Sequence, residues 1–424
     1  MRVAVIGSGG REHAICDVVS RSSLLECLYA IPGNIGMADI ATCIEIGVND
    51  FSAIKSFCLE KNIDLVLVGP EVPLANGISE TLEKHGINVI GCDSYAAQLE
   101  SSKSFTKELC DKAGIKTAAY QVFTDKDKAI AYLHSTKKFP IVIKADGLAA
   151  GKGVIISDTK DQAITAVDEI FAGKFGDMKK IVIEEFLKGI EASFFAISDG
   201  RTFKILSNAG DHKRIGEGDT GLNTGGMGTY SPTPYVTKQV EDKVINNILH
   251  PTFELLKKEG HPYKGIIFAG LMITDEEEVY LIEYNIRFGD PEAQSILVRL
   301  ETDFLAICQA VLEEKLAEIE IKFSDDKAIT VVLAANGYPE SYQKGTIISN
   351  LDEVSKLPNI KIFHAGTKLE NEVLVANGGR VLNITAVGKN FDDAYREVYK
   401  AVDMVNWQDK YYRKDIAKKI LVNS

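Results

Sequence analysis

The chain has 424 residues, of which 45% are hydrophobic and 25% charged, and its formal net charge is −12. This length suits a protein of two or three domains, and the negative charge argues against a nucleic-acid-binding surface. The seven cysteines are scattered singly, without the spacing of a zinc site. Because we find no membrane-spanning apolar run and no signal-peptide pattern, we expect a cytoplasmic protein.

The first hundred residues alternate short apolar strands with amphipathic stretches. We expect strands at 3–6, 28–31, 44–46, 64–68 and 88–90. Strands separated by helix-length segments pair in parallel, so residues 1–102 predict a doubly wound sheet. The turns at 7–10, 32–36 and 69–71 follow strand ends, and we expect them to meet at the carboxyl edge of the sheet, where ligands bind.

The first of these turns reads Gly-Ser-Gly-Gly-Arg-Glu-His over residues 7–13 and matches half of a dinucleotide-binding fingerprint. Glu12 stands where the third glycine belongs, and the second strand ends without a ribose-binding acid, so the pattern argues against NAD. Gly9, Gly10 and Arg11 would still place N–H groups and a guanidinium at a helix start, which suits a smaller phosphate. A tight turn without any ligand is the alternative.

After residue 103 the strands come in adjacent runs, which predicts an α+β region. We expect strands at 141–144, 154–157, 181–186 and 192–197, and helices at 160–171 and 237–258. Residues 211–231 show no secondary-structure period and predict a long functional or disordered loop. A last unit, from 328, has expected strands at 329–334, 347–348, 360–364, 373–375 and 381–387 and a helix at 392–405.

Two motifs in the middle of the chain carry chemistry. Residues 144–153 form a glycine-rich loop whose spacing fails the P-loop pattern but suits a hairpin over nucleotide phosphates, with Lys144 as a fixed charge. A flexible hairpin with a solvated lysine is the alternative. In the predicted strand at 281–287, Glu283, Asn285 and Arg287 share one face. Two oxygen donors beside a guanidinium suit a metal-bound triphosphate next to a carboxylate substrate, whereas a solvated polar edge is disfavoured by the apolar opposite face.

With these motifs, essentially the whole chain resembles the phosphoribosylamine-glycine ligase family of ATP-grasp enzymes. The matching motifs lie at 7–13, 32–36, 68–74, 98–107, 144–154, 182–187, 191–194, 211–214, 219–228, 287–292, 364–367 and 377–382. The resemblance implies a fold of α/β and α+β parts. These are an N-terminal Rossmann-like domain at 1–102, a central ATP-grasp domain of two α+β subdomains at 103–327, with a mobile ATP lid at 118–190, and a small mixed α+β C-terminal domain at 328–424.

The resemblance also implies the reaction, which is the ATP-driven joining of glycine to 5-phosphoribosylamine through a glycyl phosphate in purine biosynthesis. Mg²⁺ or Mn²⁺ would be held by Glu283 and Asn285, and the catalytic residues would be Arg287, Lys144, Asp211 and Asn223. ATP would contact Lys103, Lys144, Gly147, Gly151, Lys152, Gly153, Glu184, Glu185, Phe186, Leu187 and Glu191. Phosphoribosylamine and glycine would contact Gly9, Gly10, Arg11, Glu12, Asn34, Gly36, Pro70, Glu71, Asp211, Asn223, Gly225, Gly226, Met227 and Arg287.

The expected partners are these small molecules only, with no nucleic acid and no membrane, and the expected state is a monomer or a weak dimer. Another ATP-grasp carboxylate-amine ligase or carboxylase is the main alternative, followed by a catalytically silent ATP-binding regulator and a nicotinamide dehydrogenase. Two departures from the family pattern stand out. Leu222 replaces a usual proline, and the strand expected before Glu283 offers no additional acidic metal ligand.

Overall fold

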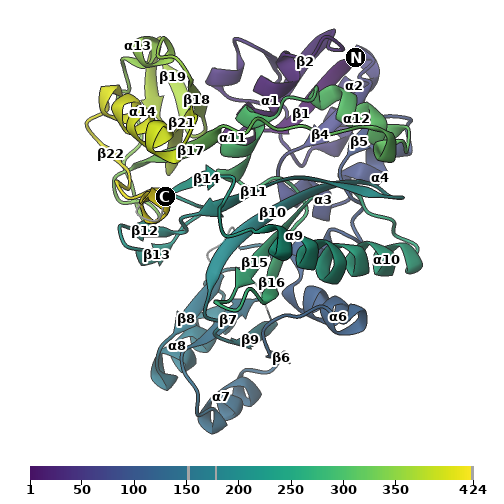
Figure 1. Cartoon of the computed structure of the whole chain (residues 1–424), viewed down its shortest axis with the longest axis vertical. Helices are drawn as coiled ribbons and strands as arrows, with labels where there is room; N and C mark the ends of the chain where they lie inside the picture. Colours follow the sequence, from purple (N-terminus) through teal and green to yellow (C-terminus); the bar gives the residue numbers. More distant parts are fainter. Residues whose placement is uncertain (150–152, 177–178, 422–424) are drawn as a thin grey trace.

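The computed structural model describes residues 1–149, 153–176 and 179–421. In Figure 1 the N-terminal sheet and the C-terminal strands lie side by side at one end of the molecule, and a small four-stranded sheet lies at the other. A long sheet runs between them. No helix in the described part of the chain is long and apolar enough to cross a membrane.

The N-terminal sheet has the strand order β3-β2-β1-β4-β5 with every pair parallel, which confirms the doubly wound prediction. Its strands are β1 (Arg2–Gly7), β2 (Cys27–Pro32), β3 (Thr42–Cys43), β4 (Leu65–Val68) and β5 (Asn88–Ile90). Its helices are α1 (Gly10–Ser20), η1 (Ile35–Met37), α2 (Phe51–Lys61), α3 (Glu71–Ala75), α4 (Ile78–Glu83) and α5 (Gln98–Ser101). The strand predicted at 44–46 is wrong, because the N–H of Ile46 bonds to the carbonyl of Ile44 and bends the chain away from the sheet.

The small sheet is antiparallel, in the order β6-β9-β7-β8. Its strands are β6 (Tyr120–Phe123), β7 (Ile141–Ala145), β8 (Val154–Ser157) and β9 (Ile181–Glu185), and α6 (Lys103–Ala113) precedes it. The helices α7 (Lys126–Ser135) and α8 (Lys160–Phe171) share a compact apolar core with this sheet. α8 has the bounds predicted for it and begins after Thr159, whose hydroxyl accepts the N–H of Gln162.

The long sheet has nine strands in the order β16-β15-β10-β11-β14-β17-β21-β18, with β22 beside β17. It passes without a break from the predicted ATP-grasp region into the predicted C-terminal region, where β14 pairs with β17. Its strands are β10 (Ile190–Asp199), β11 (Phe203–Asp211), β14 (Gly228–Ser231), β15 (Lys264–Ile273), β16 (Val279–Asn285), β17 (Lys327–Ala335), β18 (Ile360–His364), β21 (Arg380–Gly388) and β22 (Lys410–Tyr411).

The remaining elements cover the long sheet or project from it. The helix predicted at 237–258 is present as α9 (Lys238–Val244), a π-turn η2 (Ile245–Leu249) and α10 (His250–Lys258). The others are α11 (Glu292–Ile296), η3 (Leu297–Arg299), α12 (Phe304–Leu312), η4 (Leu316–Glu318), α13 (Leu351–Ser355), α14 (Phe391–Met404), α15 (Lys418–Leu421) and the hairpin of β19 (Thr367–Glu370) and β20 (Val373–Ala376).

Two further predictions of secondary structure, a loop at 211–231 and a strand at 347–348, are wrong. Residues 211–231 are not a loop, because they contain the hairpin of β12 (Arg214–Gly216) and β13 (Thr220–Asn223) and then β14 in the long sheet. β14 finds its partner a hundred residues later, where Gly228 pairs with Val331, so no local period marks it. The strand predicted at 347–348 is reduced to a single bridge between Ile347 and Val375.

Candidate active site

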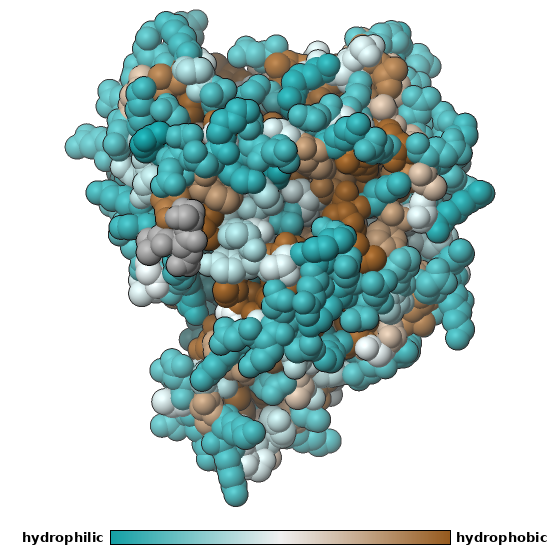
Figure 2. Space-filling model, in the orientation of Figure 1, coloured by the Kyte–Doolittle hydropathy of each residue, from teal (hydrophilic) through white to brown (hydrophobic). Residues whose placement is uncertain are grey.

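One cleft of about 730 Å³ is lined by residues from every region of the chain. Figure 2 shows a largely hydrophilic face on which apolar residues gather around the middle of the molecule. The cleft lining includes many residues predicted for ATP, namely Lys103, Lys144, Gly153, Glu184, Glu185, Phe186, Leu187 and Glu191. It also includes residues predicted for catalysis, the other substrates and metal, namely Arg11, Glu71, Asp211, Asn223, Gly225, Glu283, Asn285 and Arg287. Gly151 and Lys152 lie outside the described residues.

Buried charges hold the small sheet against the long sheet at this cleft. Lys144 on β7 lies 3.0 Å from one carboxylate oxygen of Glu184 on β9, and Lys107 on α6 lies 3.2 Å from the other. All three side chains are at most 4% exposed. Lys144 also donates to the carbonyl of Ile282 on β16, and Lys107 to the hydroxyl of Thr117. The carboxylate of Glu184 therefore positions two lysines, and the end of its strand lines the cleft.

Lys103 begins α6 and points toward the glycine-rich loop. Its ammonium donates to the carbonyl of Gly147 at 2.7 Å, which joins α6 to the loop after β7. Burial lowers the pKa of Lys103, although the charge of Glu283 opposes that shift. Lys103 and Lys144 thus present two cations to one end of the cleft, which is the charge that a triphosphate requires.

The predicted metal pair lies on β16, where strand alternation places both side chains on the same face. Burial alone would raise the pKa of Glu283, but the charges of Lys213, Lys144 and Lys103 hold it below its ordinary value. Lys213 lies 3.8 Å from Glu283 and 2.9 Å from Glu191. The side-chain nitrogen of Asn285 is buried without a hydrogen-bond partner. In the described part of the chain, no group of three or more His, Cys, Asp or Glu residues is arranged to hold a metal ion.

Arg287 follows β16 and is held between two carboxylates. Its Nε lies 3.2 Å from Glu71 at the start of α3, and its Nη2 bonds to Glu100 on α5. Burial alone would raise the pKa of Glu71, but the charges of Arg287 and Arg11 lower it to about 2. The N-terminal domain therefore orients the guanidinium that sequence analysis placed beside glycine.

Two carboxylates share a negative environment deeper in the cleft. Burial, and next the charge of Glu292, raise the pKa of Asp211 well above its ordinary value. Burial likewise raises the pKa of Glu292, whose Oε1 accepts the hydroxyl of Ser193 at 3.0 Å. Like charges in a low-dielectric site do not both ionise readily, so the charge of each carboxylate opposes ionisation of the other.

The glycine-rich turn after β1 is filled by its own glutamate. The Oε2 atom of Glu12 accepts the N–H of Gly9 at 2.6 Å, and Oε1 accepts Arg11 Nε at 2.5 Å. A Cβ added to Gly69 would lie 2.1 Å from Glu12 Oε1, and one added to Gly7 would lie 2.5 Å from Glu12 Cγ. The glutamate that stands in place of the third glycine therefore occupies the space over the turn.

Several predicted substrate residues lie outside the cleft lining and join domains instead. A Cβ on Gly10 would lie 2.3 Å from Asn383 of β21, and one on Gly36 would lie 2.4 Å from His364 of β18. The side-chain nitrogen of Asn34 donates to carbonyls of Ser8 and His364, both at 2.8 Å. Six more predicted residues lie outside the lining. Gly9 lies beside Asp290, Pro70 precedes α3, Gly226 packs against Pro291, and Met227 lies in the C-terminal core. The other two are Glu12 over the turn after β1 and Gly147, whose carbonyl accepts from Lys103.

Sequence reasoning missed Lys107, Lys213, Glu292 and Arg380 as cleft residues. Each lies in a motif that carried the resemblance, so the motif itself was the available signal. Their roles depend on partners distant in the chain. For example, Arg380 of the C-terminal strands bonds to carbonyls of Gly225 and Asp290, which no local pattern indicates.

A parallel N-terminal sheet, a small antiparallel sheet that brings lysines to a cleft, and a carboxylate-amide pair on the facing strand together define an ATP-grasp ligase. The chain matches three family models, described as the N domain (residues 1–100), the ATP-grasp (A) domain (101–293) and the C domain (328–419) of phosphoribosylglycinamide synthetase. It belongs to that family.

Sequence similarity to named relatives extends over nearly the whole chain. The chain is 48% identical to a phosphoribosylamine-glycine ligase of Brucella melitensis, over 98% of this chain and 97% of that protein. It is 47% identical to the chloroplastic ligase of Arabidopsis thaliana, over 97% of this chain and 79% of that protein. The crystal structure of the Thermotoga maritima phosphoribosylamine-glycine ligase is 33% identical, with a TM-score of 0.83, covering 98% of this chain and all of that one.

Proposed function

We propose that the chain joins glycine to 5-phosphoribosylamine, forming glycinamide ribonucleotide, ADP and phosphate. The observation that carries this proposal is the single cleft in which the lysines suited to a triphosphate meet the Arg287 and Asp211 groups suited to an amino acid and its acyl phosphate. The full-length match to ligases that bear this reaction in their names supports the choice of substrates. The product belongs to the early steps of purine biosynthesis.

ATP would lie between the small sheet and the long sheet. Lys103 and Lys144 would bind its phosphates together with the loop at 147–153, and Glu184 to Leu187 would place the adenine along the end of β9. Glu191 would bind the ribose. Glu283, whose carboxylate is held below its ordinary pKa by nearby lysines, and the side-chain carbonyl oxygen of Asn285 supply oxygen ligands that fit Mg²⁺ or Mn²⁺. A bound divalent ion would neutralise phosphate charge during transfer.

The reaction has two steps that the cleft residues can assist. A carboxylate oxygen of glycine attacks the γ-phosphorus of ATP, the bond to the bridging oxygen breaks, and ADP leaves. The amine of phosphoribosylamine then attacks the acyl carbon, loses a proton, and releases phosphate. Arg287 and Lys144 would neutralise charge on the acyl phosphate, and Asn223 and Asp211 would orient the reacting groups.

Phosphoribosylamine would lie toward the N-terminal domain, where Arg11 and Glu71 reach the cleft. We place Gly9, Gly10, Glu12, Asn34, Gly36 and Pro70 behind that wall as its support, with Gly225, Gly226 and Met227 supporting the glycine side. We also propose that the chain acts in the cytoplasm as a monomer or weak dimer, with neither nucleic acid nor membrane as a partner. The net charge of −12 supports the exclusion of nucleic acid.

An ADP-release assay with each substrate omitted in turn tests the proposal. Release should require glycine and phosphoribosylamine together, and the products should include glycinamide ribonucleotide by mass. A carboxylase of the same fold would instead show turnover that bicarbonate stimulates without glycine. That result would contradict the proposed substrates while leaving ATP-grasp chemistry intact. An Arg287→Ala variant with unchanged turnover would contradict the proposed role of that residue.

A further inference from the structure

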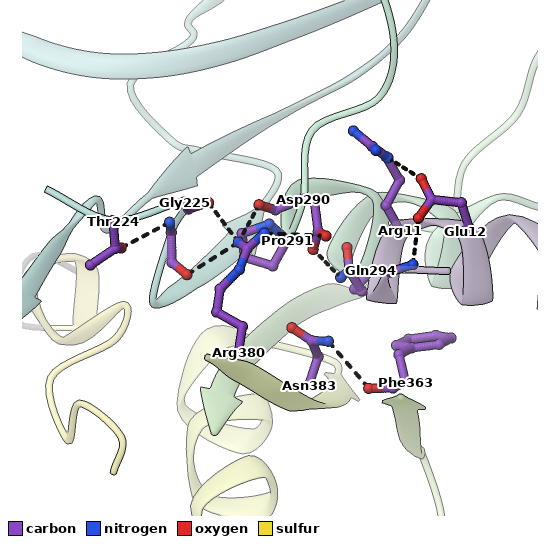
Figure 3. A network of polar contacts seen from close by, with 12 residues as sticks. Arg11, Glu12, Thr224, Gly225, Asp290, Pro291, Gln294, Phe363, Arg380 and Asn383 are labelled. Atoms are coloured by element: carbon purple, nitrogen blue, oxygen red, sulfur yellow. Dashed lines mark hydrogen bonds and ion pairs between the residues drawn. The ribbon is translucent and has the colours of Figure 1, made fainter. Parts of the chain in front are cut away.

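Arg380 extends from the C-terminal strand β21 into the cleft and bonds to two segments of the ATP-grasp region, one at Gly225 and one at Asp290 (Figure 3). Its Nη1 donates to the carbonyls of Gly225 and Asp290, both at 2.6 Å, and lies 3.4 Å from that of Gly226. Its Nη2 lies 3.2 Å from the Asp290 carboxylate. Tyr338, also C-terminal, accepts the N–H of Gly225 at 3.2 Å. The C-terminal region therefore holds Gly225 at both its N–H and its carbonyl.

The packing around Gly225 and Gly226 leaves little room for a side chain at either position. A Cβ on Gly225 would lie 3.0 Å from Arg380 Cζ, and one on Gly226 would lie 2.6 Å from Pro291 Cδ. The side chain of Arg380 is only 20% exposed, so its hydrogen bonds form in a protected environment. The planar guanidinium bridges the two segments from Nη1 while its Nη2 reaches the Asp290 carboxylate, and a lysine ammonium has no second nitrogen with which to make both sets of contacts.

The two segments that Arg380 joins carry the groups proposed for glycine activation. Asn223 ends the hairpin just before Gly225, and Arg287 lies three residues before Asp290. The segment after Arg287 is held from the opposite side as well, because Arg11 of the N-terminal domain donates to the carbonyl of Phe288 at 3.2 Å. The N-terminal and C-terminal regions thus both fix the same short stretch of chain.

We propose that Arg380 is a positioning residue of the ligase reaction, which sets the separation of Asn223 and Arg287 across the cleft. This inference rests on the proposed function. It makes the C-terminal region part of the catalytic apparatus without requiring Arg380 to touch a substrate. Misplacement of reacting groups by a fraction of an ångström lowers kcat, and that is the effect that loss of the guanidinium should produce.

The test compares Arg380→Ala, Arg380→Lys and the control Arg396→Ala, in which an exposed arginine of α14 loses its pair with Asp393. We expect Arg380→Ala to lower kcat about tenfold or more while KM for ATP stays within about twofold. Arg380→Lys should stay well below the parent despite its charge, and the control should match the parent. Added guanidinium ion should restore part of the turnover of Arg380→Ala but none of any loss in the control.

The outcomes separate the alternatives. Parent protein without glycine-dependent ADP release would contradict the proposed function, whereas equal turnover of the parent and Arg380→Ala would overturn only the positioning role. A parallel loss of thermal stability, ATP affinity and turnover in both Arg380 variants, without guanidinium rescue, would show that Arg380 only stabilises the fold. An insoluble Arg380→Ala variant beside an Arg380→Lys variant with full turnover would overturn the proposal too.

Discussion

Replacing Glu184 by glutamine should expose the energetic cost of the buried charges that join the small sheet to α6. In the native protein one carboxylate lies within 3.2 Å of Lys107 and 3.0 Å of Lys144, and all three groups are almost fully buried. Glutamine keeps the shape of the side chain but removes the carboxylate charge that both ammonium groups contact. Removing one member of a buried ion pair typically costs about 3–5 kcal/mol.

The chain can limit that cost by releasing a proton from one lysine. Burial already lowers the pKa of Lys107. Deprotonating a lysine of ordinary pKa 10.5 at a pH of about 7.5 costs about 4 kcal/mol, since each pH unit is worth about 1.4 kcal/mol, and this sets an upper bound on the loss. For 424 residues unfolding as one unit, about 4 kcal/mol corresponds to a fall in Tm of roughly 4–5 °C.

The assay is thermal unfolding followed by circular dichroism at several pH values, with the double variant Lys107→Met/Glu184→Gln as control. A lysine whose folded pKa is depressed binds fewer protons in the native than in the unfolded state, so stability rises with pH up to about 10.5. This rise should begin at lower pH in Glu184→Gln than in the parent. The double variant should regain part of the lost stability because only Lys144 remains unpaired.

A Glu184→Gln protein that melts within about 1 °C of the parent at pH 7.5, with a parallel pH profile, would refute this reasoning. It would mean that water or rearrangement already screens the two lysines. A double variant less stable than the single one would also refute it, since removal of the second charge would then have brought no relief.

The other predictions concern separate features. Gly69→Ala places a Cβ 2.1 Å from Glu12 Oε1 and should lower the free energy of unfolding by about 1–3 kcal/mol in urea titrations, whereas Gly47→Ala, with nothing within 4 Å, should change it by less than about 0.5 kcal/mol. Burial lowers the pKa of His13 to about 3. Below pH 6.5 the unfolded state therefore binds a proton that the native state does not bind, and the free energy of unfolding decreases as the pH decreases. His13→Asn should flatten that dependence between about pH 6.5 and 4, and an unchanged slope would count against it. Asn285→Ala should weaken Mn²⁺ binding in the presence of ATP by about tenfold or more in electron paramagnetic resonance titrations, and unaltered binding would remove this residue from the metal site.

Much of the fold follows from local patterns. Four of the five parallel strands of the N-terminal region and the bounds of α8 agree with periodicity and capping, because those elements depend on residues a few positions apart. The segment at 211–231 was misjudged because β14 depends on β17, and its many glycines remove the side-chain alternation that identifies a strand.

The candidate site likewise has features that local sequence patterns predict and features that depend on packing between distant segments. The alternation of Glu283, Asn285 and Arg287 along one strand face could be predicted, since it depends only on strand geometry. The pairing of Glu184 with Lys107 and Lys144 could not, because it joins three elements whose relative placement is decided by packing. Glu12 shows a third case. The absence of a glycine was visible, but not that the carboxylate would fill the turn itself.

The unbroken long sheet also determines when the molecule can be completed during synthesis. β14 is an interior strand whose second neighbour, β17, emerges from the ribosome about a hundred residues later. Until then one backbone edge of β14 has no partner strand, and a protein truncated at residue 327 would keep that edge and be prone to aggregate. The final quarter of the chain is therefore a folding requirement for the catalytic region that precedes it.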